Sequence, residues 1–160
     1  MTVRTVTCST FTIERTLAAL PSQVFAAFAD VNLKTRMLAS SDDEEVGEAF
    51  GHTEFDFRIG GRERFDFVEE DGREMKYNAL YYDIVPNERI VYAYEMYAGE
   101  SRISVSVASI ELLESEISTR LIWTEQGAFL DGLDTSELRE GGTSWMIDNM
   151  AEYFDASDSR

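Results

Sequence analysis

The sequence has few of the residues from which metal centres, disulfide frameworks and catalytic triads are built. Its 160 residues include one cysteine, Cys8, and one histidine, His52. A single cysteine excludes an internal disulfide, and a single histidine cannot join a Cys/His metal cluster or, without an evident partner, a Ser-His-Asp arrangement. We therefore expect no metal, no cofactor and no catalytic residues, and we favour a protein that is not an enzyme.

Basic residues are also scarce. Lys and Arg number 14 against 31 Asp and Glu, which gives a formal net charge of −17. A nucleic-acid-binding protein needs a basic face to meet phosphates, and a surface bound to anionic lipids needs one too. The charge thus argues against nucleic acid and membrane as partners. It favours a solubilising role, with a basic partner or cationic ligand as the alternative.

Long apolar runs are missing as well. The chain has no secretory apolar region near its start and no run of transmembrane length, so we expect a soluble cytoplasmic protein. Apolar residues still make up 44% of the chain, enough for one core. The length predicts a single domain over residues 1–160, with residues 1–8 frayed, and leaves a homodimer open.

The stretch from Thr135 to Asp155 predicts a helix with an unusually wide apolar arc. At 3.6 residues per turn, one arc collects Leu138, Trp145, Met146, Ile147, Asn149, Met150, Tyr153 and Phe154. The arc is wider than the stripe of about 100° on an ordinary surface helix, so we expect a sheet to grip this helix. We predict that Ile147, Met150 and Phe154 anchor it, whereas Trp145, Met146, Asn149 and Tyr153 cover a cavity.

The rest of the chain predicts a sheet and two short helices. A strand starts at Ser9. A short helix follows from Pro21 to about Ala29, and a second, capped by Asp30 or Asn32, runs through Arg36 to Leu38. Six further strands are predicted over 53–59, 62–68, 73–85, 89–97, 101–113 and 117–124, with a loop over 126–134. Short connections indicate an antiparallel meander. We therefore predict an α+β fold in which a curled antiparallel sheet wraps around the C-terminal helix.

Two local features admit alternatives. The run Asp42 to Glu45 could bind a hard cation, but it lacks the ligand spacing and glycine of a calcium loop, so we favour a solvated loop. Gly141 and Gly142 interrupt the predicted C-terminal helix, where they could bend it or admit a closely approaching strand.

The strands offer several residues suited to a binding cavity. Tyr77 and Tyr81 share one face of their strand, and Tyr92 and Tyr94 share one face of the next; the pattern alone does not identify the concave face. Buried tyrosines need hydrogen bonds, so several facing one cavity would give an amphipathic lining. Arg58 would either pair across strands or bind an anionic head group.

Several stretches are similar to a known family. They are FTIERTL at 11–17, VFAAFAD at 24–30 after Pro21, FDFRIGGRERF at 55–65, DIVPNERIVYAYEM at 83–96, TEQGAFLDG at 124–132 and IDNMAEYF at 147–154. The chain resembles the START-like, or SRPBCC, superfamily with its helix-grip fold, in the bacterial branch related to the C-terminal domain of the activator of the heat-shock-protein ATPase. It departs from the family at Met37-Leu38 and at Gly142-Thr143, where members usually carry a Trp and a Gly-Trp pair.

The resemblance implies a hydrophobic cavity between the sheet and the C-terminal helix but no single activity. We expect a domain that binds a small lipid-like, aromatic or polyketide-type molecule. The candidate ligand-binding residues are Arg58, Tyr77, Tyr81, Tyr92, Tyr94, Trp123, Trp145, Met146, Asn149 and Tyr153. One alternative is a cyclase or dehydratase in which a tyrosine, His52 or Glu95 moves a proton. Another is a regulator of a chaperone ATPase, which the acidic charge disfavours.

Overall fold

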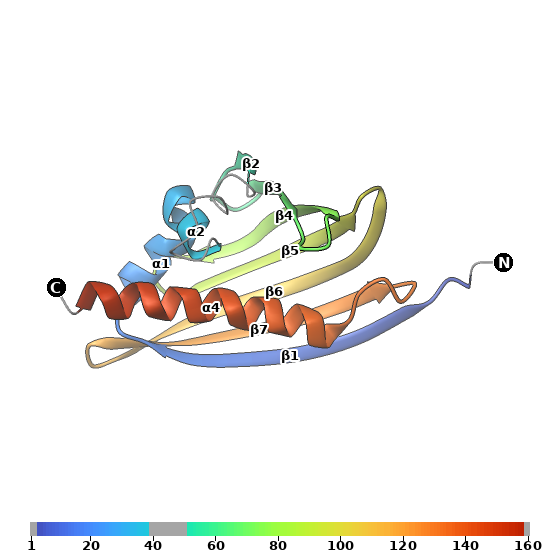
Figure 1. Cartoon of the computed structure of the whole chain (residues 1–160). Coiled ribbons are helices and arrows are strands. Elements are labelled where there is room, and N and C mark those ends of the chain that lie inside the picture. The colour runs from blue at the N-terminus through green and yellow to red at the C-terminus, as the bar shows by residue number, and fades with distance from the viewer. Residues whose placement is uncertain (1–2, 39–50, 159–160) are drawn as a thin grey trace.

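A computed structural model of the chain describes residues 3–38 and 51–158. The elements follow one another as a strand, two short helices, six strands and a long helix (Figure 1). Their bounds are β1 Val6–Leu17, α1 Pro21–Ala29, α2 Val31–Leu38, β2 Gly51–Phe55, β3 Arg62–Val68, β4 Glu74–Val85, β5 Arg89–Ala98, β6 Ser101–Ser115, β7 Ser118–Leu130 and α4 Ser136–Asp158. The acidic run at 42–45 lies outside the described residues.

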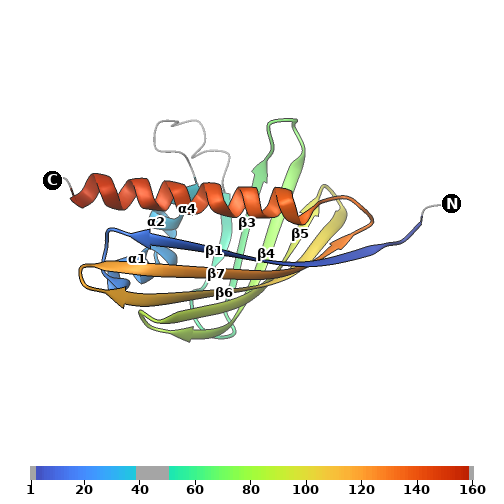
Figure 2. The same ribbon diagram turned by 90° about the horizontal axis from the view of Figure 1, so that it is seen from below.

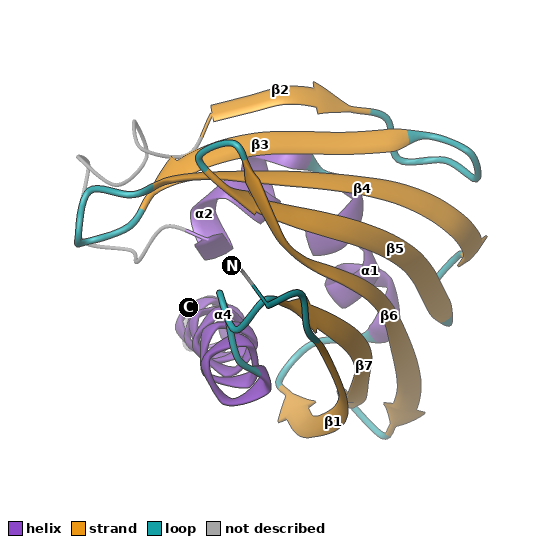
Figure 3. Cartoon of the chain, turned by 90° about the vertical axis from the view of Figure 1, so that its right-hand side faces the viewer, coloured by secondary structure: helices purple, strands orange, loops and turns teal. Residues whose placement is uncertain are grey.

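All seven strands form one antiparallel sheet in the order β1-β7-β6-β5-β4-β3-β2. Figure 3 shows that the sheet curls, with α2 and α4 on its concave side. The chain is therefore α+β with the predicted helix-grip arrangement, and the strand count of six to seven is confirmed. No helix in the described ranges is both long and apolar enough to cross a bilayer.

The largest differences from the predicted strand boundaries are at the start of β1 and the ends of β7 and β2. β1 begins at Val6 instead of Ser9, and β7 continues through the predicted loop to Leu130. The two extensions pair with each other, with Val6 opposite Leu130, so each strand is lengthened by hydrogen bonds to the other. β2 stops at Phe55, and the chain then turns through Gly60 and Gly61. A Cβ on Gly61 would lie 2.0 Å from the Asp56 carbonyl oxygen, so only glycine fits this turn.

The two short helices form where predicted, and their caps explain why. Pro21 is the first residue of α1, and the Gln23 side chain accepts the Leu20 N–H at 2.8 Å. The Asp30 carboxylate accepts the backbone N–H groups of Asn32 and Leu33 at 2.8 and 3.1 Å, which satisfies two of the free donors at the start of α2.

Helix α4 packs along β1 and against α2, and Figure 2 shows it running beside β1. Ile147 and Met150 are fully buried and Phe154 nearly so, which confirms the predicted anchoring residues. The Arg15 guanidinium also pairs with Asp148 across the β1 side. Gly141 and Gly142 have open space beside them, so the close approach of a strand is wrong as an explanation for them.

The structure identifies the concave face that the sequence pattern left open. Tyr81, Tyr92 and Trp123 are 2%, 6% and 4% exposed and belong to the core, whereas Tyr82, the neighbour of Tyr81 on the other face of β4, is 60% exposed. Odd positions of β4 as far as Tyr81, odd positions of β7 and even positions of β5 therefore point inward, because successive side chains of a strand alternate between faces.

Candidate functional site

Four tyrosines form a continuous cluster on the inner face of β4 and β5. The Tyr77 ring lies 4.9 Å from that of Tyr94, Tyr94 lies 5.9 Å from Tyr92, and Tyr92 lies 5.9 Å from Tyr81, measured between centroids. Trp123 of β7 extends the cluster, with its ring 6.4 Å from Tyr92. The strand register brings them together, since Tyr81 pairs with Tyr92 and Ala79 with Tyr94. We call these five residues the aromatic cluster.

A buried carboxylate lies at the α2 side of the aromatic cluster. Glu63 of β3 has no exposed surface. It accepts hydrogen bonds from Lys34 Nζ at 2.6 Å and from the Tyr81 hydroxyl at 3.3 Å, and its second oxygen lies 3.1 Å from His52 Nε2. We call Glu63, Lys34, His52 and Tyr81 the Glu63 cluster. Its carboxylate connects α2 with three neighbouring strands.

The partners of Glu63 determine its ionisation. Burial by itself would raise the pKa of the Glu63 carboxyl, but the Lys34 charge and the hydrogen bonds from His52 and Lys34 outweigh it, so the pKa lies below its usual range. Burial likewise opposes the charged form of Lys34, yet Glu63 holds the Lys34 pKa above its usual range. Burial raises the pKa of Tyr81 to about 12. The pair Lys34–Glu63 is therefore fully charged at neutral pH.

A second buried carboxylate lies at the other side of the aromatic cluster. Glu125 of β7 is 1% exposed; it accepts the Tyr94 hydroxyl on one oxygen and the Trp123 indole N–H at 3.4 Å on the other. Arg139 of α4 lies 3.8 Å from the same carboxylate. We call Glu125, Tyr94, Trp123 and Arg139 the Glu125 cluster. Burial raises the pKa of Glu125 despite the hydrogen bond from Tyr94 and the Arg139 charge.

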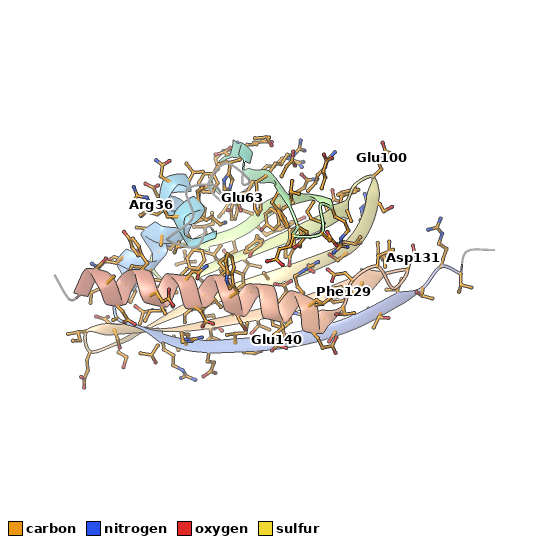
Figure 4. The ribbon with its side chains drawn as sticks, viewed as in Figure 1. Arg36, Glu63, Glu100, Phe129, Asp131 and Glu140 are labelled. Atoms are coloured by element: carbon orange, nitrogen blue, oxygen red, sulfur yellow. The ribbon has the colours of Figure 1, made fainter. Side chains whose placement is uncertain are left out.

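Arg139 ties the start of α4 to the sheet. Its guanidinium donates to the Tyr94 hydroxyl at 2.9 Å, to Ser104 Oγ at 2.8 Å and to the Asp134 carboxylate at 2.7 Å, and it lies over the Phe129 ring at 5.5 Å. Figure 4 shows Glu63 near α2 and Phe129 near the start of α4. The two carboxylate clusters thus flank the tyrosines from opposite sides.

Two hydroxyls of the aromatic cluster have no hydrogen-bond partner in the part of the chain that the structure describes. Those of Tyr77 and Tyr92 hydrogen-bond to none of the residues at 3–38 and 51–158. Within these ranges, Ser106 Oγ alone is both sealed and unpartnered, so the Tyr77 and Tyr92 hydroxyls border accessible space. Tyr77 is also partly exposed although it points inward. Burial raises the pKa of both phenols well above its usual value, so both remain neutral donors.

Several predicted ligand-binding residues lie outside the aromatic cluster. Met146 and Tyr153 pack, partly buried, against the core. Asn149 donates to the Met37 carbonyl at 3.2 Å, so its amide joins α4 to α2. Trp145 is 44% exposed because α4 leans on β1 and α2, which leaves the opposite side of the helix outside. As a lining residue Trp145 is therefore a wrong prediction.

Arg58 is a second correction. Its guanidinium pairs with Asp56 at 2.8 Å, and its side chain is 69% exposed, because the chain has left β2 before this point and no longer alternates between faces. Glu95 lies on the outer face of β5 and pairs with Arg102 at 2.9 Å.

The sequence pattern did not reveal either buried carboxylate, and it gave His52 no evident partner. The structure corrects the second point, since His52 contacts Glu63 and Thr35 Oγ1. The available signal was alternation: Glu63 shares its face with Phe65, and Glu125 shares its face with Trp123. An acidic residue in register with an apolar row predicts a buried charge that needs a partner.

Two hollows lie at the rim of the fold. One of about 620 Å³ lies between the start of α1, the β4–β5 turn and the end of β6. Another of about 310 Å³ is lined in part by Phe67 and Met75, which form the next inward-facing pair of the β3–β4 ladder after Phe65 and Tyr77. Neither includes a predicted ligand-binding residue, although the smaller one adjoins the aromatic cluster.

The chain is similar to known proteins in both sequence and fold. The family model for Activator of Hsp90 ATPase homolog 1-like protein matches residues 18–155. The Mll3558 protein from Rhizobium loti is 42% identical, with a TM-score of 0.80 over 92% of this chain and 98% of that one. A protein from Rhizobium leguminosarum is 37% identical, with a TM-score of 0.87 over 97% and 99%.

A more distant structure shares the fold alone. The CV1439 protein from Chromobacterium violaceum is 23% identical, with a TM-score of 0.75 over 91% of this chain and 96% of that one. A search of curated protein sequences found no match. The match over residues 18–155, together with two relatives above 30% identity, shows that the chain belongs to the family of Activator of Hsp90 ATPase homolog 1-like proteins, within the SRPBCC superfamily.

Proposed function

We propose that the protein binds a small hydrophobic molecule on the inner face of the sheet, against the aromatic cluster. The observation that carries this proposal is the pair of unpartnered hydroxyls on Tyr77 and Tyr92, which border accessible space among buried aromatic rings. Because these hydroxyls border accessible space and make no hydrogen bond to the described residues, they are available to donate to a ligand that supplies an acceptor.

The residues around the aromatic cluster on the inner face of the sheet also suit a hydrophobic ligand. Small-molecule sites are mostly apolar and aromatic, with a few fixed polar groups. Here the Phe65 ring stacks on Tyr77 at 4.5 Å and the Phe28 ring lies 6.0 Å from Trp123, so the aromatic walls hold one another in place. SRPBCC proteins commonly bind hydrophobic ligands, which agrees with the proposal.

The same groups favour binding over proton transfer. Both ring nitrogens of His52 face partners within the protein, and Glu95 is engaged by Arg102 outside the aromatic cluster. The raised pKa of Tyr92 makes its phenol a poor acid at neutral pH. The residues proposed as proton donors or acceptors in a cyclase or dehydratase are thus either occupied or poorly matched to that role.

Tryptophan fluorescence can test the proposal because the chain has only two tryptophans. In a Trp145→Phe variant, Trp123 beside Tyr92 is the sole reporter. Titration with 2-ethylnaphthalene, or with any molecule that native mass spectrometry finds bound to the purified protein, is expected to change Trp123 emission saturably. The matched Trp123→Phe variant, which retains the exposed Trp145, is expected to show little change. An unliganded protein with no saturable Trp123 response would contradict the proposal.

A further inference from the structure

The basic groups inside the fold are already committed to carboxylates. Among the described residues, the basic side chains that reach the interior are Lys34, Arg139 and His52, with side-chain exposures of 11%, 10% and 8%. Lys34 pairs with Glu63 at 2.6 Å, and Arg139 pairs with Asp134 at 2.7 Å while facing Glu125. An anionic ligand on the inner face would therefore find no free cation there.

The groups that remain free are neutral donors. The hydroxyls of Tyr77 and Tyr92 have no partner among residues 3–38 and 51–158, whereas Tyr81 donates to Glu63 and Tyr94 to Glu125. These two engaged tyrosines lie beside the free ones, at 5.9 Å for Tyr81–Tyr92 and 4.9 Å for Tyr77–Tyr94. The free hydroxyls are thus placed between two buried carboxylates whose cations are already engaged, so they offer donors to a ligand acceptor and no free positive charge to an anion.

We propose that the ligand is an apolar molecule with a hydrogen-bond acceptor, such as a ketone or ester carbonyl, and without an anionic group. Tyr77 and Tyr92 determine this specificity by donating to the acceptor. The inference rests on the proposed function and adds to it the chemical class of the ligand. It separates carbonyl compounds from fatty acids and phosphate-bearing lipids, which carry the same apolar bulk with a negative charge.

Simple energetics set the expected selectivity. A net hydrogen bond contributes about 1 kcal/mol, so replacing an ethyl group with an acetyl group should tighten binding about fivefold. Moving an unpaired carboxylate into the interior should weaken binding by a factor on the order of 100 or more. The effect of the carboxylate is the sharper test, because a site that binds fatty acids would bind the carboxylate more tightly instead of more weakly.

Three naphthalenes of similar size supply the probes: 2-ethylnaphthalene, 2-acetylnaphthalene and 2-naphthoate. We expect dissociation constants, measured by calorimetry at neutral pH, to rank the acetyl compound tightest and the carboxylate weakest. In the Tyr77→Phe/Tyr92→Phe variant the acetyl and ethyl compounds should bind equally. The matched control is Tyr82→Phe, on the outer face of β4, which should keep the preference; thermal unfolding checks that each variant is folded.

The outcomes separate this inference from the proposed function. If 2-ethylnaphthalene binds but 2-naphthoate binds tighter than the ketone, the inference is wrong and the binding function stands. The inference is equally wrong if the folded double variant keeps the full preference for the ketone. If none of the three probes binds, both the inference and the proposed function are contradicted.

Discussion

Glu63 and Glu125 occupy comparable places in the fold but differ in their partners. Both are buried on the inner face, and each accepts a tyrosine hydroxyl. Glu63 has a lysine at 2.6 Å, whereas Glu125 has its arginine at 3.8 Å because Asp134 holds that guanidinium at 2.7 Å. The pKa of Glu63 is accordingly lowered and that of Glu125 raised.

The difference assigns distinct roles to the two clusters. The Glu63 cluster joins α2 to β2, β3 and β4 through a complete ion pair, and its charges depend on one another for their stability. In the Glu125 cluster the charge of the carboxylate is less fully neutralised, because its arginine lies 3.8 Å away. The hydrogen bond to Glu125 holds Tyr94 next to Tyr77 and Tyr92. The first cluster therefore links α2 to the sheet through mutually dependent charges, and the second positions the surface that we propose for the ligand.

The largest effect is expected from removing one charge of the Glu63 cluster. Lys34→Met leaves a fully buried carboxylate without its cation, and breaking a buried ion pair from one side costs ~3–5 kcal/mol. We expect the free energy of unfolding in urea at pH 7 to fall by that amount. The double variant Lys34→Met/Glu63→Gln should recover most of the loss. A single variant within about 1 kcal/mol of the native protein would contradict this role, since surface pairs have effects of that size.

A smaller loss is expected when the Glu125 cluster loses a hydrogen bond. Tyr94→Phe removes the donor to Glu125 and the acceptor of Arg139, and hydrogen bonds to charged groups contribute ~1.5–3 kcal/mol. Urea unfolding should show a loss in that range. A loss as large as that of Lys34→Met would abolish the distinction between the two clusters.

The two carboxylates should also respond to pH with opposite signs. The lowered pKa of Glu63 means that its contribution to stability is present above its usual value of 4.5 and is lost as the pH falls below it. The raised pKa of Glu125 means that its contribution is present below 4.5 and is lost as the pH rises through the folded-state pKa.

Stability curves of two variants can resolve these signs. Between about pH 7 and about pH 3.5, acidification should reduce the advantage of the native protein over Glu63→Gln. The same acidification should favour the native protein relative to Glu125→Gln. Parallel curves for the two variants would show that the carboxylates do not differ as described.

The smallest effect is expected at the unpartnered hydroxyl of Tyr92. Tyr92→Phe removes a group that makes no hydrogen bond within the described chain, so the free energy of unfolding should change by no more than about 0.5 kcal/mol. Urea unfolding of the ligand-free protein measures it, with Tyr94→Phe as the matched comparison on the same strand face. A loss equal to that of Tyr94→Phe would mean that the Tyr92 hydroxyl already has a partner.

The sequence predicted most of the fold because each element carries local signals. Pro21 and Asp30 mark the starts of the short helices, and the alternation in β5 and β6 indicates strands, although it does not show which of their faces is concave. The extension of β7 to Leu130 was missed because residues 126–130 pair with the start of β1, more than a hundred residues earlier in the chain. Such pairing leaves no local signal.

The candidate site was only partly predictable. The four tyrosines and Trp123 were predicted as ligand-binding residues because their residue type suits a pocket. The structure shows that these residues lie together, and their role in binding stays a prediction. Trp145 and Arg58 were placed by periodicity that assumed a helix over the middle of the sheet and a strand continuing past Phe55. The ion pair Lys34–Glu63 joins elements far apart in sequence, and only the tertiary fold could reveal it.

The most direct test of the binding surface is to locate a bound probe. Nuclear Overhauser contacts between bound 2-acetylnaphthalene and the protein identify which protons lie beside it. Binding at the aromatic cluster predicts contacts to the rings of Tyr77, Tyr92 and Trp123. Contacts confined to Leu20, Pro86 and Leu113, which line the hollow of about 620 Å³ at the rim of the fold, would contradict binding at the aromatic cluster.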